Sequence, residues 1–385
     1  MLLKQILSLA LTFASVSIPE KDYSNRDFLE NLIEKQGYHV KKYLVTTSDG
    51  YQLSLHRIRS SKYTKSPVLL LHGLQASGAQ WVLNGNKSLA FMLSRAGYDV
   101  WLLNNRGTTL SSGHKTLSYH DPKYWDFSFH EIGIYDLPAA IDLILHATRR
   151  NGLHFIGHSQ GCSSILVTAT QRPAYQRKII SAYFLNPGVY YRHISADWNN
   201  TFHALSEVLR ETKNPALMTR NTLLAKVVAK SCNGPFLGNL CTSYFMQSLG
   251  GDNHEAANPQ NLISIYAKYI FNNAGWKQFD HYKQLFDAGR FQMYDYGPKI
   301  NYRIYGSSQP LEYDLSEVYF PISLMYGTLD TLTPAADIKS LIPEIRNLKG
   351  VIGLPWNHMD LVHSKNADKW LHRPIIDSLN DNNFH

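Results

Sequence analysis

The stretch LHFIGHSQGCSSILV, residues 153–167, places a serine between two apolar runs. Ser159 lies in the pattern Gly-x-Ser-x-Gly, with Gly157 and Gly161 on either side. Between a strand and a helix this pattern is typical of a nucleophile elbow, a turn so sharp that larger side chains beside the serine would collide with the neighbouring elements. The stretch therefore predicts a strand–turn–helix unit with Ser159 as nucleophile. The alternative is a serine in an ordinary glycine-rich bend.

Apolar strand-like runs alternate with helix-like segments on both sides of this turn. The expected strands are SPVLLLHGL (66–74), YDVWLLNNRG (98–107), LHFIGHS (153–159), KIISAYFLNPG (178–188), YFPISLMYGTLD (319–330) and LKGVIGLPWNHMD (348–360). The expected helices are AQWVLNGNKSLAFMLSRAG (79–97), IYDLPAAIDLILHAT (134–148) and GCSSILVTAT (161–170). A β-hairpin, residues 38–58, precedes them and turns at Ser48-Asp49-Gly50. This alternation is typical of an α/β fold, a mostly parallel sheet with helices on both faces.

The alternation stops between Val189 and Glu312, where the sequence is helix-like and loop-like and rich in aromatic residues. We therefore expect one α/β domain, residues 18–188 and 313–385, interrupted by a mainly helical insertion, residues 189–312.

The N-terminus has the pattern of an export signal. Residues 1–17, MLLKQILSLALTFASVS, contain one lysine, then an apolar segment, then small residues. This order is typical of a secretory signal peptide, with cleavage after Ser17, and the alternative is a buried N-terminal helix. Two Asn-x-Ser/Thr sequons, at Asn86 and Asn199, agree with export as N-glycosylation sites.

Three cysteines are too few for a disulfide scaffold. Cys232 and Cys241 flank NGPFLGNL, whose glycines and proline let the chain turn back on itself. In an oxidising compartment we expect these two to form a disulfide, worth about 2–3 kcal/mol in the chain-entropy model. Cys162 is expected to be a small buried residue behind the serine turn.

The composition limits the classes of function. Hydrophobic residues make up 44% of the 385 and charged residues 18%, which suits a large core. No stretch approaches 18 uninterrupted apolar residues, so no transmembrane helix is expected. The formal net charge is +8, but no Lys/Arg run exceeds two residues, which argues against nucleic acid. The positive charge suits an anionic lipid surface, or it serves only solubility.

A nucleophilic serine needs a histidine base and a carboxylate that orients the base. In α/β-hydrolases these follow the serine in the order acid, then histidine, each at the carboxyl end of a strand. Asp330 ends the strand-like run ISLMYG, in the loop TLDTLTP, and His358 follows the final apolar run. His363, His372 and His385 are weaker candidates for the base. Asp360 fits a helix N-terminus better than the triad.

The oxyanion that forms on the attacked carbonyl needs backbone N–H donors. We expect one on Gln160, directly after the nucleophile, and one on Leu74, in the loop after VLLLHG. Gly73 lets that loop approach closely. His72 and His158 are expected to be packing residues.

No metal or organic cofactor is expected. HEIGIYD is not His-Glu-x-x-His, and no Cys/His spacing is typical of a zinc site. Neither Gly-x-Gly-x-x-Gly nor a P-loop occurs.

The motifs resemble those of the animal acid-lipase family, which includes gastric and lysosomal acid lipases. The blocks are DGYQLSLHRI, LLLHGL, NNRGTTLSSGHKTLS, YWDFSFHEIGIYDLPA, IGHSQG, FQMYDYG, YGTLDTLTP and WNHMDLV, spread over nearly the whole mature chain. The resemblance implies an α/β-hydrolase fold and a Ser159–Asp330–His358 triad, with Leu74 and Gln160 supplying the oxyanion hole. It also implies that residues 189–312 form a cap with a movable lid and that Cys232 and Cys241 match the two halves of the family's cap disulfide.

The implied activity is hydrolysis of neutral-lipid esters at a lipid–water interface, by a secreted or lysosomal enzyme. Triacylglycerol is the first expected substrate class and cholesteryl ester the second. The rivals are an esterase on small soluble esters and a lipid carrier without catalysis. Two departures lie near the catalytic face: Thr108 follows Arg106-Gly107, where the family usually has asparagine, and Asn186 stands where it usually has alanine.

Overall fold

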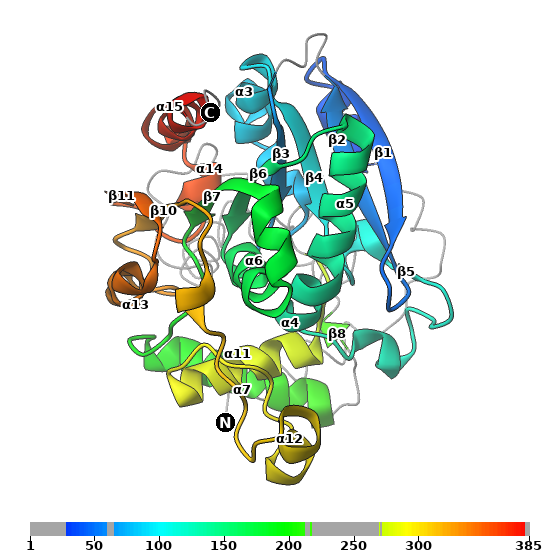
Figure 1. Cartoon of the computed structure of the whole chain (residues 1–385), viewed down its shortest axis with the longest axis vertical. Coiled ribbons are helices and arrows are strands. Elements are labelled where there is room, and N and C mark those ends of the chain that lie inside the picture. The colour runs from blue at the N-terminus through cyan, green and yellow to red at the C-terminus, as the bar shows by residue number, and fades with distance from the viewer. Residues whose placement is uncertain (1–27, 60–64, 212–215, 218–268, 270–271, 382–385) are drawn as a thin grey trace, which may run out of the picture.

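The computed structural model describes residues 28–59, 65–211, 216–217, 269 and 272–381 (Figure 1). The predicted signal peptide, residues 1–17, and the predicted Cys232–Cys241 pair lie outside the described residues. None of the described helices is long and apolar enough to cross a membrane.

A nine-stranded sheet runs through the molecule in the order β1-β2-β4-β3-β6-β7-β10-β11, with β5 paired to β2. From β4 to β11 neighbouring strands are parallel, and β1 and β2 form the antiparallel hairpin predicted at this end. The strands are β1 (His39–Thr46), β2 (Tyr51–Arg59), β3 (Pro67–Leu71), β4 (Asp99–Asn104), β5 (Gly113–His114), β6 (Leu153–His158), β7 (Ile179–Leu185), β10 (Ile322–Gly327) and β11 (Leu348–Leu354).

Each face of the sheet carries its own apolar core, because successive side chains of a strand point to opposite faces. In β3, Leu69 and Leu71 belong to one core and Val68 and Leu70 to the other, and all four are fully buried. Burial on both faces explains why these strands are continuous apolar runs rather than alternating ones.

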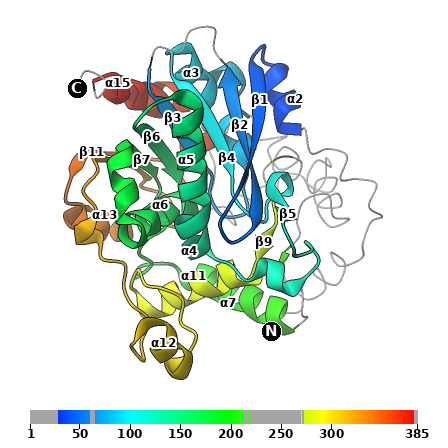
Figure 2. The ribbon, with the colours of Figure 1, turned by 45° about the vertical axis from the view of Figure 1, so that its right-hand side comes forward.

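Helices cover both faces, as the alternating pattern predicted (Figures 1 and 2). The core with Leu69 and Leu71 also contains residues of α5 (Leu137–Thr148), α6 (Gln160–Gln171) and α13 (Ala335–Leu341). The opposite core contains residues of α2 (Phe28–Glu34), α3 (Leu89–Arg95), α14 (Asp360–His363) and α15 (Arg373–Asp381). A single turn, α4 (Phe129–Glu131), leads through a π-helical segment into α5.

The helix predicted over residues 79–97 is wrong for its first half. Residues Gly78–Trp81 and Gly85–Lys87 form separate 3-10 turns, and only α3, Leu89–Arg95, is α-helical. Ser77 caps the first turn by accepting a hydrogen bond from the N–H of Ala79, at 3.3 Å. Gly85 has φ +54°, a left-handed conformation that ends a right-handed helix.

Between β7 and β10 the structure describes three helices and two short strands. They are α7 (Ala196–Glu211), β8 (Ala216–Leu217), β9 (Ala274–Gly275), α11 (Trp276–Ala288) and α12 (Pro298–Tyr305). In both views α7, α11 and α12 lie together at one end of the molecule, beyond the edge of the sheet (Figures 1 and 2).

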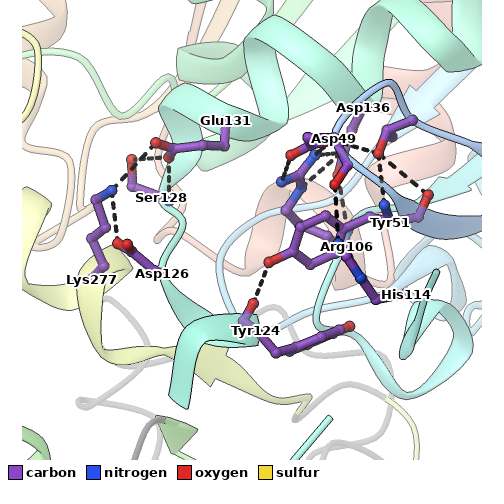
Figure 3. A network of polar contacts seen from close by, with 11 residues as sticks. Asp49, Tyr51, Arg106, His114, Tyr124, Asp126, Ser128, Glu131, Asp136 and Lys277 are labelled. Carbon is purple, nitrogen blue, oxygen red and sulfur yellow. Dashed lines mark hydrogen bonds and ion pairs between the residues drawn. The ribbon is translucent and has the colours of Figure 1, made fainter. Parts of the chain in front are cut away.

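A buried arginine fixes the hairpin turn to the start of α5 (Figure 3). The Arg106 backbone N–H and Nε donate to the Asp136 carboxylate at 2.9 and 2.8 Å, and Nη1 donates to Asp49 at 2.6 Å. The guanidinium stacks 3.9 Å from the centroid of the Tyr51 ring. Although burial lowers the pKa of Arg106, the two carboxylates hold this pKa above its usual value. The side chain is therefore a permanent, paired charge.

A second buried pair joins α11 to α4 (Figure 3). Lys277 Nζ lies 3.4 Å from Glu131 Oε1 and 3.0 Å from Asp126 Oδ1. The other oxygen of Glu131 accepts from the N–H of Ser128 at 2.6 Å, which completes a capping box. Burial raises the pKa of Glu131, but the Lys277 charge, with help from His130 and the Ser128 N–H, lowers it to about 2. The carboxylate is thus ionised down to strongly acidic pH.

We expect Glu131→Gln to lower the free energy of unfolding at pH 6 by about 3 kcal/mol. The Glu131 pKa is about 2 when folded against a reference of 4.5, and each pKa unit corresponds to about 1.4 kcal/mol. A depressed carboxyl pKa stabilises above the unfolded value, so the difference from wild type should shrink as the pH falls from 4.5 to 2. Urea unfolding across this range measures it.

The control for this experiment is Glu312→Gln, which removes an exposed ion pair with Arg290. It should change the free energy of unfolding by less than about 1 kcal/mol. A Glu131→Gln effect that is equally small, or that does not depend on pH, would contradict the assignment.

Candidate active site

The turn between β6 and α6 holds Ser159 in a backbone conformation that few residues adopt. Its φ is +53° and its ψ is −117°, outside the usual allowed regions for a residue with a side chain. A Cβ on Gly161 would lie 2.6 Å from the carbonyl oxygen of Leu71, so this position requires glycine. The Ser159 N–H donates to the carbonyl of Leu185 at 2.9 Å. The predicted strand–turn–helix is confirmed, and the turn has the geometry of an elbow.

Asp330 and His358, from the loops after β10 and β11, lie in direct contact. His358 Nδ1 is 2.7 Å from Asp330 Oδ2, and both side chains are almost fully buried. Since a carboxylate only accepts, His358 Nδ1 carries the proton in this bond, which leaves Nε2 as the unprotonated nitrogen of the neutral ring.

The loop of Asp330 holds its carboxylate with three further donors. Oδ1 accepts from the N–H groups of Leu332 and Thr333 at 2.8 and 2.9 Å, and Oδ2 accepts from Thr333 Oγ1 at 2.6 Å. Thr333 Oγ1 also lies 3.3 Å from His358 Nδ1. These bonds fix the direction in which the carboxylate faces the imidazole.

Asn186 links the loops that carry Asp330 and His358. It directly follows β7, with φ +46°, and is fully buried. Its Oδ1 accepts from the N–H of Gly327 at 2.8 Å, and its Nδ2 donates to the carbonyl of His358 at 3.3 Å. The side chain therefore spans the start of the acid loop and the backbone of the histidine.

His158 has a polar contact as well as a packing role. Its Nε2 donates to the carbonyl of His358 at 3.1 Å, and the two rings lie 4.8 Å apart. Burial, with the neighbouring His358, lowers the pKa of His158 well below its usual value. His158 is thus a neutral donor that, together with Asn186, holds the His358 backbone.

The loop after β3 lies against the elbow. A Cβ on Gly73 would be 3.1 Å from Ser159 Cβ, so the absence of a side chain permits the close approach. His72 is buried and bonds Gly73 O through Nδ1 at 2.8 Å, and burial lowers its pKa to about 4. Leu74 follows directly and is half-buried, while Gln160 begins α6. Both predicted oxyanion donors therefore come from segments that meet at Ser159.

Ser159 itself is 9% exposed and Asp330 and His358 are 5% and 3% exposed, so water has little access to the group. Among the described residues no hydrogen bond joins the Ser159 hydroxyl to His358. The turn that carries Ser159 is instead linked to the His358 loop by the hydrogen bond from His158 to the His358 carbonyl. Serine–histidine bonds are often long without substrate. A strained serine, a histidine and a fixed carboxylate are the groups that nucleophilic acyl transfer requires.

Of the other candidate residues, His385 lies outside the described residues, and the rest lie apart from this contact. Asp360 begins α14 and accepts from the N–H of Asn357 at 3.0 Å, the helix N-terminal place expected of it. His372 Nδ1 bonds the carbonyl of Lys87 at 3.0 Å, and burial lowers the pKa of His363 to about 3. The Cys162 thiol is buried and donates to Gly157 O at 3.2 Å. Within the described ranges no cluster of three His, Cys, Asp or Glu side chains could hold a metal ion.

The two sequons differ in surroundings. Asn86 is exposed in the turn Gly85–Lys87, whereas Asn199 is half-buried within α7.

Comparison with known proteins agrees with this geometry. The family model for the α/β-hydrolase fold matches residues 66–362, and a partial α/β-hydrolase lipase region matches residues 29–85. The chain is 36% identical to Lipase 1 of Drosophila melanogaster (91% of this chain, 79% of that one) and 34% to human Lipase member N (90% and 89%). It is 33% identical to mouse gastric triacylglycerol lipase (90% of both). The chain belongs to the lipases of the α/β-hydrolase family.

Solved structures show the same fold. A putative lipase from Sulfolobus solfataricus matches with TM-score 0.58 at 15% identity, over 86% of this chain and 90% of that one. The monoglyceride lipase of Saccharomyces cerevisiae matches with TM-score 0.54 at 13% identity, over 89% and 95%. These structures confirm the predicted fold class, and the lipase relatives and the family model confirm the predicted enzyme class, a carboxylic ester hydrolase.

The sequence reasoning missed three of the lipase's site contacts. Thr333 follows Asp330 at the spacing of an Asx-type turn, a signal that could have found it. Asn186, which stands where the family usually has alanine, indicated a position near the site. It did not indicate the hydrogen-bond partners of the Asn186 side chain. Nothing in the local sequence indicated that the His158 ring would reach the His358 carbonyl, since that bond spans 200 residues.

We expect Asn186→Gly to lower kcat on a soluble ester about tenfold with little change in KM, because the histidine loop loses a support while the left-handed backbone is kept. Asn186→Asp keeps the acceptor for Gly327 but loses the donor to His358, and its new charge should move the acidic limb of the pH–rate profile to higher pH. Arg149→Gly, at another left-handed position, is the control. Wild-type kcat in Asn186→Gly would contradict the role.

Proposed function

We propose that this lipase hydrolyses carboxylic esters of neutral lipids through a Ser159–Asp330–His358 triad, with triacylglycerol as the preferred substrate class. Cholesteryl esters are the second class. The observation that carries the proposal is the 2.7 Å Asp330–His358 contact beside a serine held at φ +53°. The similarity to a gastric triacylglycerol lipase supports the choice of substrate.

In the proposed mechanism His358 Nε2 takes the proton of Ser159 Oγ as Oγ attacks the ester carbonyl carbon. Asp330, bonded to Nδ1, stabilises the imidazolium that forms. Collapse of the tetrahedral intermediate breaks the bond to the alcohol oxygen, which receives the proton from His358, and an acyl-enzyme remains. Water, deprotonated by the same histidine, then attacks the acyl-enzyme; the bond to Ser159 Oγ breaks, Oγ takes the proton back from His358, and the fatty acid is released.

We assign the oxyanion hole to the backbone N–H groups of Leu74 and Gln160. The oxyanion would lie between the loop after β3 and the N-terminus of α6, where the helix dipole also favours negative charge. The contact of Gly73 with Ser159 supports this placement.

We infer that the insertion, residues 189–312, is a cap with a lid that lets the enzyme act at a lipid–water interface. Support comes from α11: Gln278 Nε2 donates to Gln160 Oε1 at 3.2 Å, so a cap helix contacts the residue beside the nucleophile. The same helix is held to the core by the Lys277–Glu131 pair.

We also propose that the chain is exported, to the cell exterior or to a lysosome, after loss of residues 1–17. The leader-like composition and the sequons support this, and the exposed Asn86 is the better glycan acceptor of the two. In an oxidising compartment Cys232 and Cys241 would form the cap disulfide.

The test is fatty-acid release from emulsified triolein by wild type and Ser159→Ala. We expect Ser159→Ala, Asp330→Asn and His358→Gln each to lose at least about 10³-fold in kcat, while all three still fold. A fluorophosphonate probe should label wild type at Ser159 only. Ser94→Ala, a buried serine in α3 on the opposite face, should behave as wild type. Equal release by wild type and Ser159→Ala would overturn the nucleophile.

Substrate class is tested separately, with triolein, cholesteryl oleate and a soluble butyrate ester. A lipase should show a rise in rate when substrate passes from monomers to an emulsion. Activity on the soluble ester without that rise would favour the esterase, and no release from any of the three would favour a lipid carrier.

A further inference from the structure

Helix α12 presents apolar side chains to solvent at the end of the molecule. Ile300 is 45% exposed, Tyr302 68% and Ile304 55%, and Leu311, in the following segment, is 41% exposed. These are four of the nine large exposed hydrophobic residues among the described ranges. Such a concentration within twelve residues of one segment marks an interaction surface better than single scattered residues do.

Hydrogen bonds hold α12 to the segments on either side of it, so its apolar side chains are exposed on an anchored helix. Asn301 is fully buried, and its Nδ2 donates to Asp295 Oδ1 at 2.7 Å and to the carbonyl of Ser308 at 3.1 Å. Tyr305 donates to the carbonyl of Tyr294 at 2.9 Å. Since Asn301 and Tyr305 are four residues apart, they hold one side of α12 to the cap and leave the other side outward.

Two cations lie on the outward side. Lys299 and Arg303 are exposed and four residues apart, between Ile300 and Ile304 on one flank and Tyr302 on the other. Neither forms an ion pair with any described residue. By contrast, the nearby Arg290 is neutralised by Glu312 at 3.1 Å. The outward side of α12 is therefore apolar and positively charged, and the described residues do not neutralise the charges of Lys299 and Arg303.

Helix α12 lies at the same end of the molecule as α11, the helix that contacts the nucleophile turn. The segment before it is bonded to α11, through Gln284 and Asp295, and α11 contacts Gln160 beside the nucleophile. In both views α12 is the element farthest from α3 and α15 (Figures 1 and 2). A surface that engages α12 would therefore face the cap end of the enzyme.

We propose that α12 is an anchor that binds the surface of lipid particles carrying anionic phospholipid. Lys299 and Arg303 contact the headgroup phosphates, and Ile300, Tyr302 and Ile304 insert between the headgroups. An amphipathic cation-and-apolar helix that lies in the interfacial plane has the chemistry for both contacts. The proposal rests on the proposed lipase function, because it supplies that function with its docking surface.

The experiment measures binding of the Ser159→Ala variant, which cannot consume lipid, to phosphatidylcholine vesicles with and without phosphatidylglycerol. We expect tighter binding to the anionic vesicles. Lys299→Gln/Arg303→Gln should reduce that preference about 25-fold, at roughly fivefold per cation, and about 0.5 M salt should have a similar effect. Ile300→Ser/Ile304→Ser should weaken binding to anionic vesicles by at least about tenfold.

The matched control is Lys369→Gln/Trp370→Ser, which removes an exposed cation and a 61% exposed tryptophan just before α15, at the opposite end. It should bind anionic vesicles as the parent does. In Ser159-containing protein, the α12 variants should lower the ratio of the rate on phospholipid-coated triolein to the rate on a soluble ester.

Three outcomes would overturn the anchor. The first is binding of the α12 variants to anionic vesicles as tight as that of the control variant. The second is a parent protein with no preference for anionic vesicles. The third is a dimer, detected by light scattering, that the α12 substitutions dissociate, which would make a second copy the partner. Because binding is measured without catalysis, loss of the anchor is distinguishable from failure of the lipase assignment.

Discussion

The parallel pairing of β6, β7 and β10 is the constraint on which the site depends. In this register His158 lies opposite Leu185, and Leu185 lies opposite Met325. The residues that follow, Ser159 and Asn186, therefore leave the sheet side by side, and the acid loop begins beside them. Parallel strands bring their carboxyl ends to one edge, so residues far apart in the chain meet there without any local signal between them.

Two buried cations extend this arrangement beyond the sheet. Arg106 ties the hairpin turn to α5, and Lys277 ties α11 to α4 (Figure 3). Buried charges are costly to desolvate and contribute to stability only with close partners. Here each cation contacts two carboxylates, so the pairs compensate for burial and also fix the orientation of the elements that they join. Helix α11, which contacts Gln160 beside Ser159, is thus held in a defined position on the α/β core.

Much of this site could be predicted from sequence, because its signals are local or follow an order along the chain. Gly157 and Gly161 around Ser159 indicate a sharp turn, and Asp330 and His358 each follow a strand-like run. The polar roles of Asn186 and His158 could not be found in this way. Their partners are backbone groups of distant loops, and only the register of the sheet brings them within reach. The helix expected over residues 79–97 is wrong because Gly85 adopts a left-handed conformation that an apolar periodicity does not reveal.

The hydrogen bonds that hold Asp330 and His358 share one origin. Among the described residues their donors and acceptors, Leu332, Thr333, Asn186 and His158, all come from outside residues 189–312. The sheet and its loops thus hold Asp330 and His358, while the described part of residues 189–312 contacts their neighbours, through Gln278 to Gln160 and Trp198 to Thr331. A changed sequence between β7 and β10 would therefore leave every one of these donors and acceptors in the chain, so this segment can diverge between relatives while the Asp330–His358 contact is kept.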